Sequence, residues 1–190
     1  MRPLMLSVTP PTLVLGCALL LLGGCVSMPQ SVGEAAMFYR DYVGPVGQPG
    51  AALMRVSADG VIRVTPGSGC ADFAKPETGV ALFAAPSTKD YQYLNNRKLG
   101  VLGEPPAGFT STEVALEGGQ PVVLSYTRIW TVRGTAFNCQ MHRAFVPDAG
   151  ASYQLLAQPL LDEGRCLMVV TRLTEPTTVV PAVPAALCGR

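Results

Sequence analysis

The chain contains a single histidine, His142, so every mechanism that uses an imidazole must use this residue. Cys139 lies three positions before it, but on a strand that offset places the two side chains on opposite faces. The two residues are therefore poorly placed to share a metal ion. The cysteines form no Cys-x-x-Cys pair, so neither a zinc knuckle nor covalent haem attachment is supported. We expect no metal and no cofactor.

Serine and carboxylate patterns also give little support for catalysis. The sequence has no Gly-x-Ser-x-Gly elbow, and Gly67-Ser68-Gly69 is typical of a flexible turn. Glycosidic hydrolysis needs two carboxylates on opposite sides of the scissile bond, and the adjacent pair Asp162-Glu163 lies in a predicted turn. No glycine-rich phosphate loop is present. We therefore predict that the protein is not an enzyme, and we infer no small-molecule substrate.

The N-terminus has the pattern of a secretory signal. Arg2 is followed by a nearly uncharged apolar stretch that ends in small residues. Its densest apolar part, Leu13 to Leu22, is too short to span a bilayer as a helix, which takes about 20 residues. We therefore expect export rather than a retained membrane helix.

Leu22-Gly23-Gly24-Cys25 resembles the lipobox of bacterial lipoproteins, in which a hydrophobic residue and two small residues precede a cysteine. The resemblance implies that residues 1–24 are removed, that Cys25 receives a diacylglycerol, and that its new amino group is acylated. Two or more acyl chains make membrane attachment stable. Val26 and Ser27, directly after Cys25, carry no acidic retention signal, so the resemblance favours the outer membrane. An ordinary signal cut near Ser27 is the alternative, and it would release a soluble protein.

Charge and composition narrow the choice of partners. The chain has 14 Lys and Arg against 13 Asp and Glu, and removal of Arg2 with the signal balances the two signs. A neutral chain gives no electrostatic basis for binding nucleic acid. The expected partners are the membrane, through the lipid, and another protein of the envelope.

Four cysteines remain when Cys17 in the signal and Cys25 at the anchor are set aside: Cys70, Cys139, Cys166 and Cys188. An even number in an exported chain indicates two disulfides, with three possible connectivities. Cys139 and Cys166 each lie on the apolar face of a predicted strand, whereas the other two lie in turn-like or tail segments. We therefore favour Cys139–Cys166 together with Cys70–Cys188.

Hydrophobic periodicity predicts a short helix followed by many strands. Ser31 and Glu34 have capping-box spacing, and apolar residues recur at helical spacing over about 32–42. Asp59-Gly60 between two apolar runs predicts a β-hairpin over 52–64. Six further strands are predicted: Val80–Ala84, Thr112–Leu116, Val122–Val132, Ala136–Val146, Ser152–Ala157 and Cys166–Leu173. Short strands separated by turn residues favour a mainly β fold, an antiparallel β-sandwich of immunoglobulin- or transthyretin-like type with a short N-terminal helix.

A long polar, turn-rich connection from Pro86 to Thr110 separates two of these strands. Connections of this length in a compact domain are often functional. We identify a candidate partner-binding loop there, carried by four residues: Tyr91, Tyr93, Arg97 and Lys98. Residues 90–94 could equally form an edge strand.

The segment from Phe137 to Val170 resembles a pattern of small envelope lipoproteins with β-sandwich domains. A cysteine strand, a Phe-x-Pro-x-Ala-Gly-x-x-Tyr corner and a second cysteine strand follow one another. The corner here consists of Phe145, Pro147, Ala149, Gly150 and Tyr153. The resemblance implies a sandwich fold and carries no assigned activity.

These observations divide the chain into four parts: 1–24, signal peptide; 25–49, lipid anchor, tether and short helix; 50–175, β-sandwich domain; 176–190, Pro-rich tail. The predicted function is a lipid-anchored lipoprotein on the periplasmic face of the outer membrane, acting as a non-catalytic binding or structural subunit of an envelope assembly. The alternative is an inhibitor or immunity lipoprotein that blocks a periplasmic cell-wall hydrolase.

Overall fold

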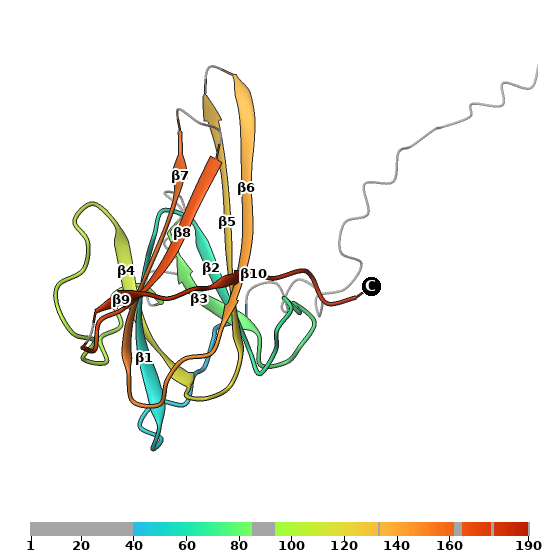
Figure 1. Cartoon of the computed structure of the whole chain (residues 1–190). Coiled ribbons are helices and arrows are strands. Elements are labelled where there is room, and N and C mark those ends of the chain that lie inside the picture. The colour runs from blue at the N-terminus through green and yellow to red at the C-terminus, as the bar shows by residue number, and fades with distance from the viewer. Residues whose placement is uncertain (1–39, 85–93, 133, 162–164, 176, 190) are drawn as a thin grey trace, which may run out of the picture.

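The computed structural model describes residues 40–84, 94–132, 134–161, 165–175 and 177–189. Within these ranges ten strands form two five-stranded sheets (Figure 1). The strands are β1 (Ala51–Ala58), β2 (Val61–Pro66), β3 (Gly79–Phe83), β4 (Thr110–Glu117), β5 (Val122–Val132), β6 (Thr135–Phe145), β7 (Ser152–Leu160), β8 (Arg165–Arg172), β9 (Thr178–Val179) and β10 (Val183–Pro184). The fold is mainly β and sandwich-like, and the six separately predicted strands are confirmed. The described part of the chain contains no helix.

The strand order is β4-β1-β7-β8-β9 in the first sheet and β10-β6-β5-β2-β3 in the second. Every pair is antiparallel except β1 with β7, which run parallel. The first sheet is therefore mixed rather than purely antiparallel. A parallel pair is possible here because β1 and β7 lie far apart in sequence, so the connection between them is long enough to return the chain to the same end of the sheet.

The predicted hairpin over 52–64 is wrong, although both of its strands exist. β1 pairs with β4 and β7 in the first sheet, whereas β2 pairs with β3 and β5 in the second. Asp59 and Gly60 instead carry the chain from one sheet to the other. A Cβ on Gly60 would lie 2.6 Å from the carbonyl oxygen of Thr127, so the close approach requires glycine. The hydroxyl of Tyr126 donates a hydrogen bond of 2.6 Å to Asp59 and holds this corner.

The inner faces of both sheets supply one hydrophobic core. Alternate residues of each strand point inward, as the period of two requires. The core includes Met54 and Val56 from β1, Ile62 and Val64 from β2, Leu124 and Tyr126 from β5, Cys139 and Phe145 from β6, Tyr153 and Leu155 from β7, and Met168 and Val170 from β8. Burial of this surface is the main stabilising contribution to the fold.

The predicted helix over 32–42 falls mostly outside the described residues, and its last residues are extended. Asp41 forms a parallel bridge with Val80, and the amide of Tyr42 donates to the Val80 carbonyl. A Cβ on Gly79 would lie 2.4 Å from the Tyr42 nitrogen. Glycine at the start of β3 therefore lets residues 41–42 cover this edge of the second sheet.

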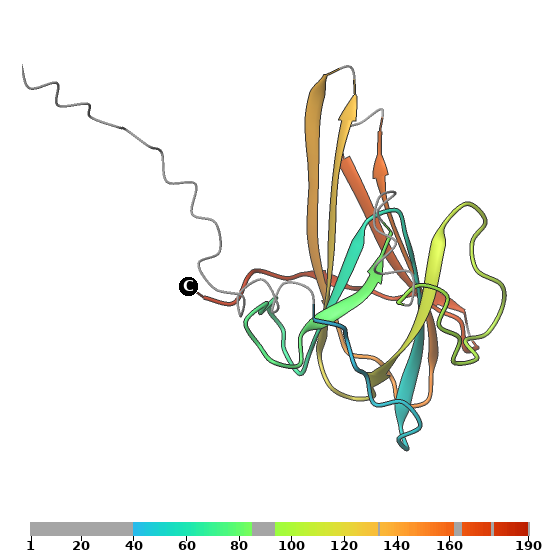
Figure 2. The same cartoon turned by 180° about the vertical axis from the view of Figure 1, so that it is seen from behind.

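The C-terminal tail crosses from one sheet to the other (Figures 1 and 2). β9 pairs with β8 and forms one edge of the first sheet, and β10 pairs with β6 and forms one edge of the second. The amide of Cys188 then donates to Ala71, and the disulfide to Cys70 holds the end of the tail. A segment with three prolines would be loose by itself, so these contacts are what order it.

The Phe-x-Pro-x-Ala-Gly-x-x-Tyr corner is a packed turn between β6 and β7. Phe145 and Tyr153 meet edge to face, with ring centroids 5.4 Å apart. The Tyr153 hydroxyl accepts a hydrogen bond of 2.8 Å from the amide of Asp148, whose carboxylate lies 3.2 Å from Arg172. The Tyr153 hydroxyl is thus hydrogen-bonded to the turn that precedes it in the chain, and this bond stabilises the corner.

Candidate binding site on the connection between β3 and β4

A row of polar side chains lies buried on the outer face of the first sheet. Arg55 of β1 lies opposite Glu113 of β4, and Ser57 lies opposite Ser111. The two serine hydroxyls are 2.7 Å apart, and Gln154 of β7 donates to Ser57. Residues of the connection from 94 to 109 cover this row, and we call them the first cover. Figure 1 shows this connection curling out beside β4.

Arg55 and Glu113 form an ion pair of 3.1 Å with side chains only 4% and 2% exposed. The Arg55 guanidinium also donates to three successive carbonyls of the cover, those of Val101, Leu102 and Gly103, at 2.7–3.1 Å. A buried charge is tolerated only when it is paired and hydrogen-bonded. Here the backbone of the cover provides those bonds.

The Glu113 carboxylate binds the backbone from the other side. One of its oxygens accepts hydrogen bonds from the amides of Leu99, Gly100 and Val101. Burial alone would raise the pKa of Glu113, but these amides and Arg55 favour the ionised form and hold its pKa below the usual value. Five consecutive residues, 99–103, are therefore held by one salt bridge.

Residues 94–97, which begin the first cover, are hydrogen-bonded to β3 and to Tyr42. Asn95 accepts from the amide of Phe83 and donates to its carbonyl, so the side-chain amide pairs like another strand residue. The Arg97 guanidinium donates to the carbonyl of Ala81 at 3.0 Å and to that of Tyr42 at 3.4 Å. Both side chains hold the fold together along this edge.

The same four residues of the first cover are also hydrogen-bonded to the edge strand β4. The amide of Asn96 donates to Ser111, and the amide of Glu113 donates to Arg97. The hydroxyl of Thr112 donates to the Leu94 carbonyl at 2.6 Å. The edges of both sheets on this side are thereby covered, which protects them from pairing with other chains.

A pocket of about 530 Å³ opens where the first cover meets the beginning of β4. Its described lining consists of Asn95, Asn96, Lys98, Pro105, Phe109, Thr110 and Ser111. Asn95 and Ser111 already have hydrogen-bond partners within the fold. Asn96, which adopts a left-handed backbone conformation with φ 71°, and Lys98 are exposed at the rim. Among the described lining residues, Asn95 and Ser111 are thus held by hydrogen bonds within the fold, whereas Asn96 and Lys98 are exposed to solvent.

The predicted partner-binding loop is only partly described. Tyr91 and Tyr93 lie outside the described residues. Lys98 is exposed and lines the pocket. Arg97 is half-buried and its guanidinium is directed at backbone carbonyls, so the two neighbouring cations lie in different environments.

Both predicted disulfides are present. Cys139 of β6 pairs with Cys166 of β8 and joins the two sheets, and Cys139 belongs to the core. Cys70 pairs with Cys188 across 118 positions of the sequence. The assignment from strand faces is therefore confirmed.

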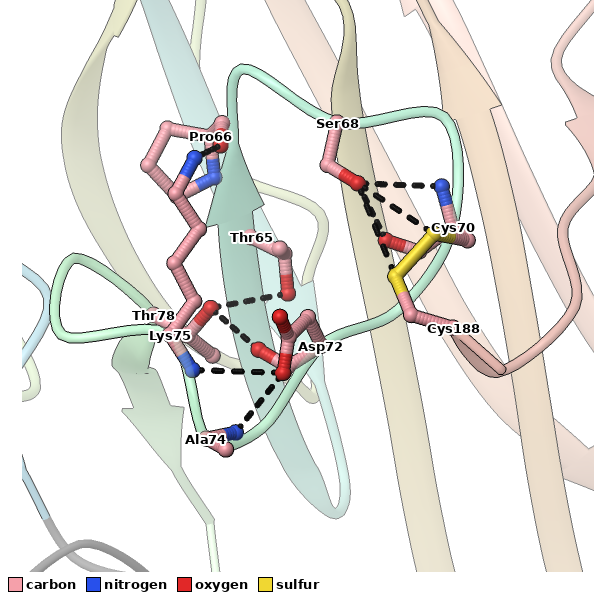
Figure 3. The surroundings of a disulfide bond; sticks show 9 residues. All are labelled: Thr65, Pro66, Ser68, Cys70, Asp72, Ala74, Lys75, Thr78 and Cys188. Atoms are coloured by element: carbon pink, nitrogen blue, oxygen red, sulfur yellow. Dashed lines mark hydrogen bonds between the residues drawn. A yellow bond between two sulfur atoms is a disulfide. The ribbon is translucent and has the colours of Figure 1, made fainter. Parts of the chain in front are cut away.

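The outer face of the second sheet is covered by residues 67–78 and by the end of the tail from 185 to 188, which we call the second cover. Its contact with the sheet is a small apolar cluster of Ala71, Val123 and Ala144, packed by Phe73 and Ala185. Figure 3 shows the internal bonds of this cover. The Ser68 hydroxyl accepts from the Cys70 amide and donates to its carbonyl.

Other side chains complete the second cover (Figure 3). Asp72 accepts from the amides of Ala74 and Lys75, and the Lys75 ammonium donates to the Pro66 carbonyl. Thr78 donates to Thr65 of β2 at 3.1 Å. These are local turn bonds of the kind that Asp and Thr make.

His142 lies under the second cover, opposite Ser125 on the neighbouring strand. Its Nδ1 is 2.8 Å from the serine hydroxyl, and its ring packs against Phe73 with centroids 5.9 Å apart. Burial lowers the pKa of His142, and Ser125 is only 1% exposed. A nucleophile needs room for a substrate at its oxygen, so this pair packs two strands together rather than forming an open catalytic site.

Arg55 and Glu113 are the residues of the candidate site that sequence reasoning missed. Each is a charge inside an apolar strand, and such a charge on an outward position is normally solvated. A sequence signal for this ion pair exists, because each of two strands carries one charge and the two charges have opposite signs. The signal can be used only once β1 and β4 are known to be adjacent.

Comparison with known proteins adds no further information on the family. No protein-family model matches the chain, and no curated protein matches it in sequence. In the described ranges there is no group of three His, Cys, Asp or Glu side chains placed to hold a metal ion. Those ranges also contain no helix with the length and apolar character needed to cross a membrane.

Proposed function

We propose that the protein is a lipoprotein of the bacterial envelope that serves as a non-catalytic binding subunit of an envelope assembly. Acylation of Cys25 anchors it to the outer membrane, and the sandwich faces the periplasm. The lipobox and the signal supply the anchor, and two disulfides agree with an oxidising compartment. We assign the immunoglobulin- or transthyretin-like type of sandwich within the same proposal, supported by two sheets whose pairs are mostly antiparallel.

One observation carries the binding role: the buried salt bridge of Arg55 and Glu113 holds residues 99–103 in a single conformation. Desolvation of two charges costs several kcal/mol unless further bonds offset it. Because of this desolvation free energy, a buried salt bridge is not expected in a connection whose only role is to join two strands. A loop ordered in advance binds with a smaller entropy loss, so the arrangement favours a recognition surface.

The surface that this salt bridge holds in place is exposed and mixed in character. Leu102 is 52% exposed although its carbonyl is held by Arg55. Lys98 and Glu104 flank it and are exposed. An apolar side chain on a fixed backbone with charges around it is the usual composition of a protein-binding patch.

The anchor is tested by metabolic labelling with a fatty-acid analogue. We expect wild-type protein to be labelled and the Cys25→Ala variant to lose the label and leave the membrane fraction. Labelling that persists in Cys25→Ala would refute acylation at this residue. Cys70→Ala serves as the control, because its thiol belongs to a disulfide.

The binding surface is tested by placing a photo-crosslinking amino acid at Leu102 in growing cells. We expect one discrete envelope adduct from this position and none from Val179, which is 69% exposed on the tail. Equal adducts from the two positions, or none from Leu102, would contradict the assignment.

The inhibitor role remains a second candidate because the first cover is both exposed and rigid, as a plug for a hydrolase cleft must be. Cells that carry Leu102→Asp would then lyse when a periplasmic wall hydrolase is induced, whereas cells carrying Val179→Asp would not. Deletion of residues 92–98 is a poor test, because it would also remove the bonds of Asn95 and Arg97 to the strands.

A further inference from the structure

The pocket between the first cover and the beginning of β4 is lined by side chains that could bind a small ligand. Lys98 lines it with an exposed ammonium group, and no hydrogen bond or ion pair joins this group to another described residue. None of the described lining residues is acidic. Glu113 follows the lining residue Ser111 by two positions, but its carboxylate is paired with Arg55. Among the described lining residues, Lys98 is therefore the one that carries a charge.

The other free groups of the pocket are suited to hydroxyls and to a ring face. Asn96 offers an amide that both donates and accepts, and Thr110 offers a hydroxyl. Phe109 and Pro105 are half-buried in the wall and contribute apolar surface. A sugar ring combines an apolar face with a rim of hydroxyls, so it matches this combination better than a purely apolar ligand does.

The pocket is also ordered before any ligand binds. The Asn95 side chain is bonded to β3, and the Ser111 hydroxyl is bonded to Ser57. Residues 99–101, which follow Lys98 directly, are held by Glu113. A ligand would thus lose little free energy to ordering the protein.

From this geometry we infer that the pocket binds a saccharide that carries a carboxylate, with Lys98 pairing the carboxylate, Phe109 packing against the ring, and Asn96 and Thr110 contacting the hydroxyls. The inference rests on the proposed function as a binding module and names a ligand class for it. Envelope glycans contain such sugars, so the site would let the anchored protein hold the wall as well as a protein partner.

The test uses two sugars that differ by one group. N-acetylmuramic acid carries an ether-linked lactate with a free carboxylate, and N-acetylglucosamine has the same ring without it. Both are titrated against the full lipidated protein in nanodiscs and followed by saturation-transfer NMR on the sugar. We expect the acidic sugar to bind about threefold more tightly, with the difference lost at 0.5 M salt because exposed charges are screened.

Variants assign the difference to particular residues. Lys98→Gln should remove the preference for the acidic sugar and leave the neutral sugar unchanged. Arg172→Gln is the control, since it removes the same charge from an ion pair with Asp148 elsewhere in the fold, and the preference should survive. Phe109→Ala should weaken both sugars about threefold to tenfold, whereas Phe109→Tyr, which keeps the ring, should not.

Two results would overturn the inference. One is a preference for the acidic sugar that persists in Lys98→Gln. The other is no detectable binding of either sugar at about 20 mM, where a site with a millimolar dissociation constant would be saturated. Crosslinking from Leu102 decides the proposed function separately, so a discrete adduct without sugar binding would remove the saccharide site and leave the protein-binding role.

Discussion

Each sheet of the sandwich has an irregular segment on its outer face, and different kinds of interaction attach the two segments. The first cover is held by a buried salt bridge that bonds to the backbone of residues 99–103. The second cover is held by the disulfide between Cys70 and Cys188 and by a small apolar cluster. One attachment depends on ionisation and the other on a covalent bond.

This difference predicts which conditions release which cover. A carboxylate can be protonated and then no longer accepts hydrogen bonds as an anion, so acid should loosen the first cover. A disulfide is indifferent to mild acid but can be reduced, so a thiol reductant should loosen the second. The polar attachment fixes individual backbone groups, whereas the disulfide only limits how far the tail can move.

Loss of the Glu113 charge should have the largest effect. Glu113→Gln leaves Arg55 buried without its counter-ion, and breaking a buried pair costs about 3–5 kcal/mol. Urea denaturation should show a lower free energy of unfolding of this size. Amides 99–101 should exchange faster with solvent, while the amides of Ala71 and Cys188 keep their protection. A double variant, Arg55→Met with Glu113→Leu, should recover part of the loss, and a double variant less stable than Glu113→Gln would contradict this explanation.

Removal of the tail disulfide should come second. Cys70→Ala with Cys188→Ala should lower the free energy of unfolding by about 2–4 kcal/mol, because the bond closes a long loop in the unfolded chain. Exchange of the Ala71 and Ala185 amides should accelerate, and that of the amides of Leu99 and Gly100 should stay slow. Equal acceleration in both covers would show that they are not independent.

Acid should act on the first cover at a predictable pH. The pKa of Glu113 is lower in the folded protein than in the unfolded chain, so its contribution to stability is complete above the unfolded value of about 4.3. It is lost as the pH falls from there through the folded pKa. Stability measured from pH 6 to 2.5 should therefore decline more steeply in the wild type than in Glu113→Gln. Parallel curves for the two proteins would count against the lowered pKa.

The smallest expected effect concerns His142 beneath the second cover. Burial lowers its pKa, so the neutral ring is favoured in the folded protein and its contribution to stability is complete above about pH 6.5. This contribution declines as the pH falls through the folded pKa. NMR titration should give a pKa that is below 6.5 in the wild type and returns toward 6.5 when the Cys70–Cys188 bond is absent. An unchanged pKa would mean that the cover does not shield the ring.

Local pattern predicted the strands well because alternation of apolar residues reports which face is buried, whatever the partner strand is. β5 (Val122–Val132) coincides with the predicted strand, and the inward face of Cys139 led to the correct disulfide. The corner at Asp59-Gly60 failed for the opposite reason. A hairpin and a sheet-to-sheet crossing place the same residues in the turn, and only the pairing of β1 and β2 with other strands separates them.

The site was harder to predict than the fold because its residues are distant in sequence. Arg97 and Lys98 are neighbours of equal charge, yet the Arg97 guanidinium donates to carbonyls of the fold, whereas the Lys98 side chain is exposed and lines the pocket. Which of two adjacent cations turns inward depends on where Ala81 and Tyr42 lie. Residues 41–42 were expected in a helix, so that contact could not be foreseen.

Local patterns in the sequence were enough to predict the mainly β class, the strand positions and the pairing of the cysteines, and the prediction of lipidation at Cys25 rests on the sequence alone. These properties follow from period, turn chemistry and motif, which act within a few residues. The folded arrangement was needed to find the register that places Arg55 opposite Glu113, the covers on the two outer faces and the pocket beside Lys98. Those features depend on non-local pairing, in which the energy of burying a charge is set by residues far away in the chain.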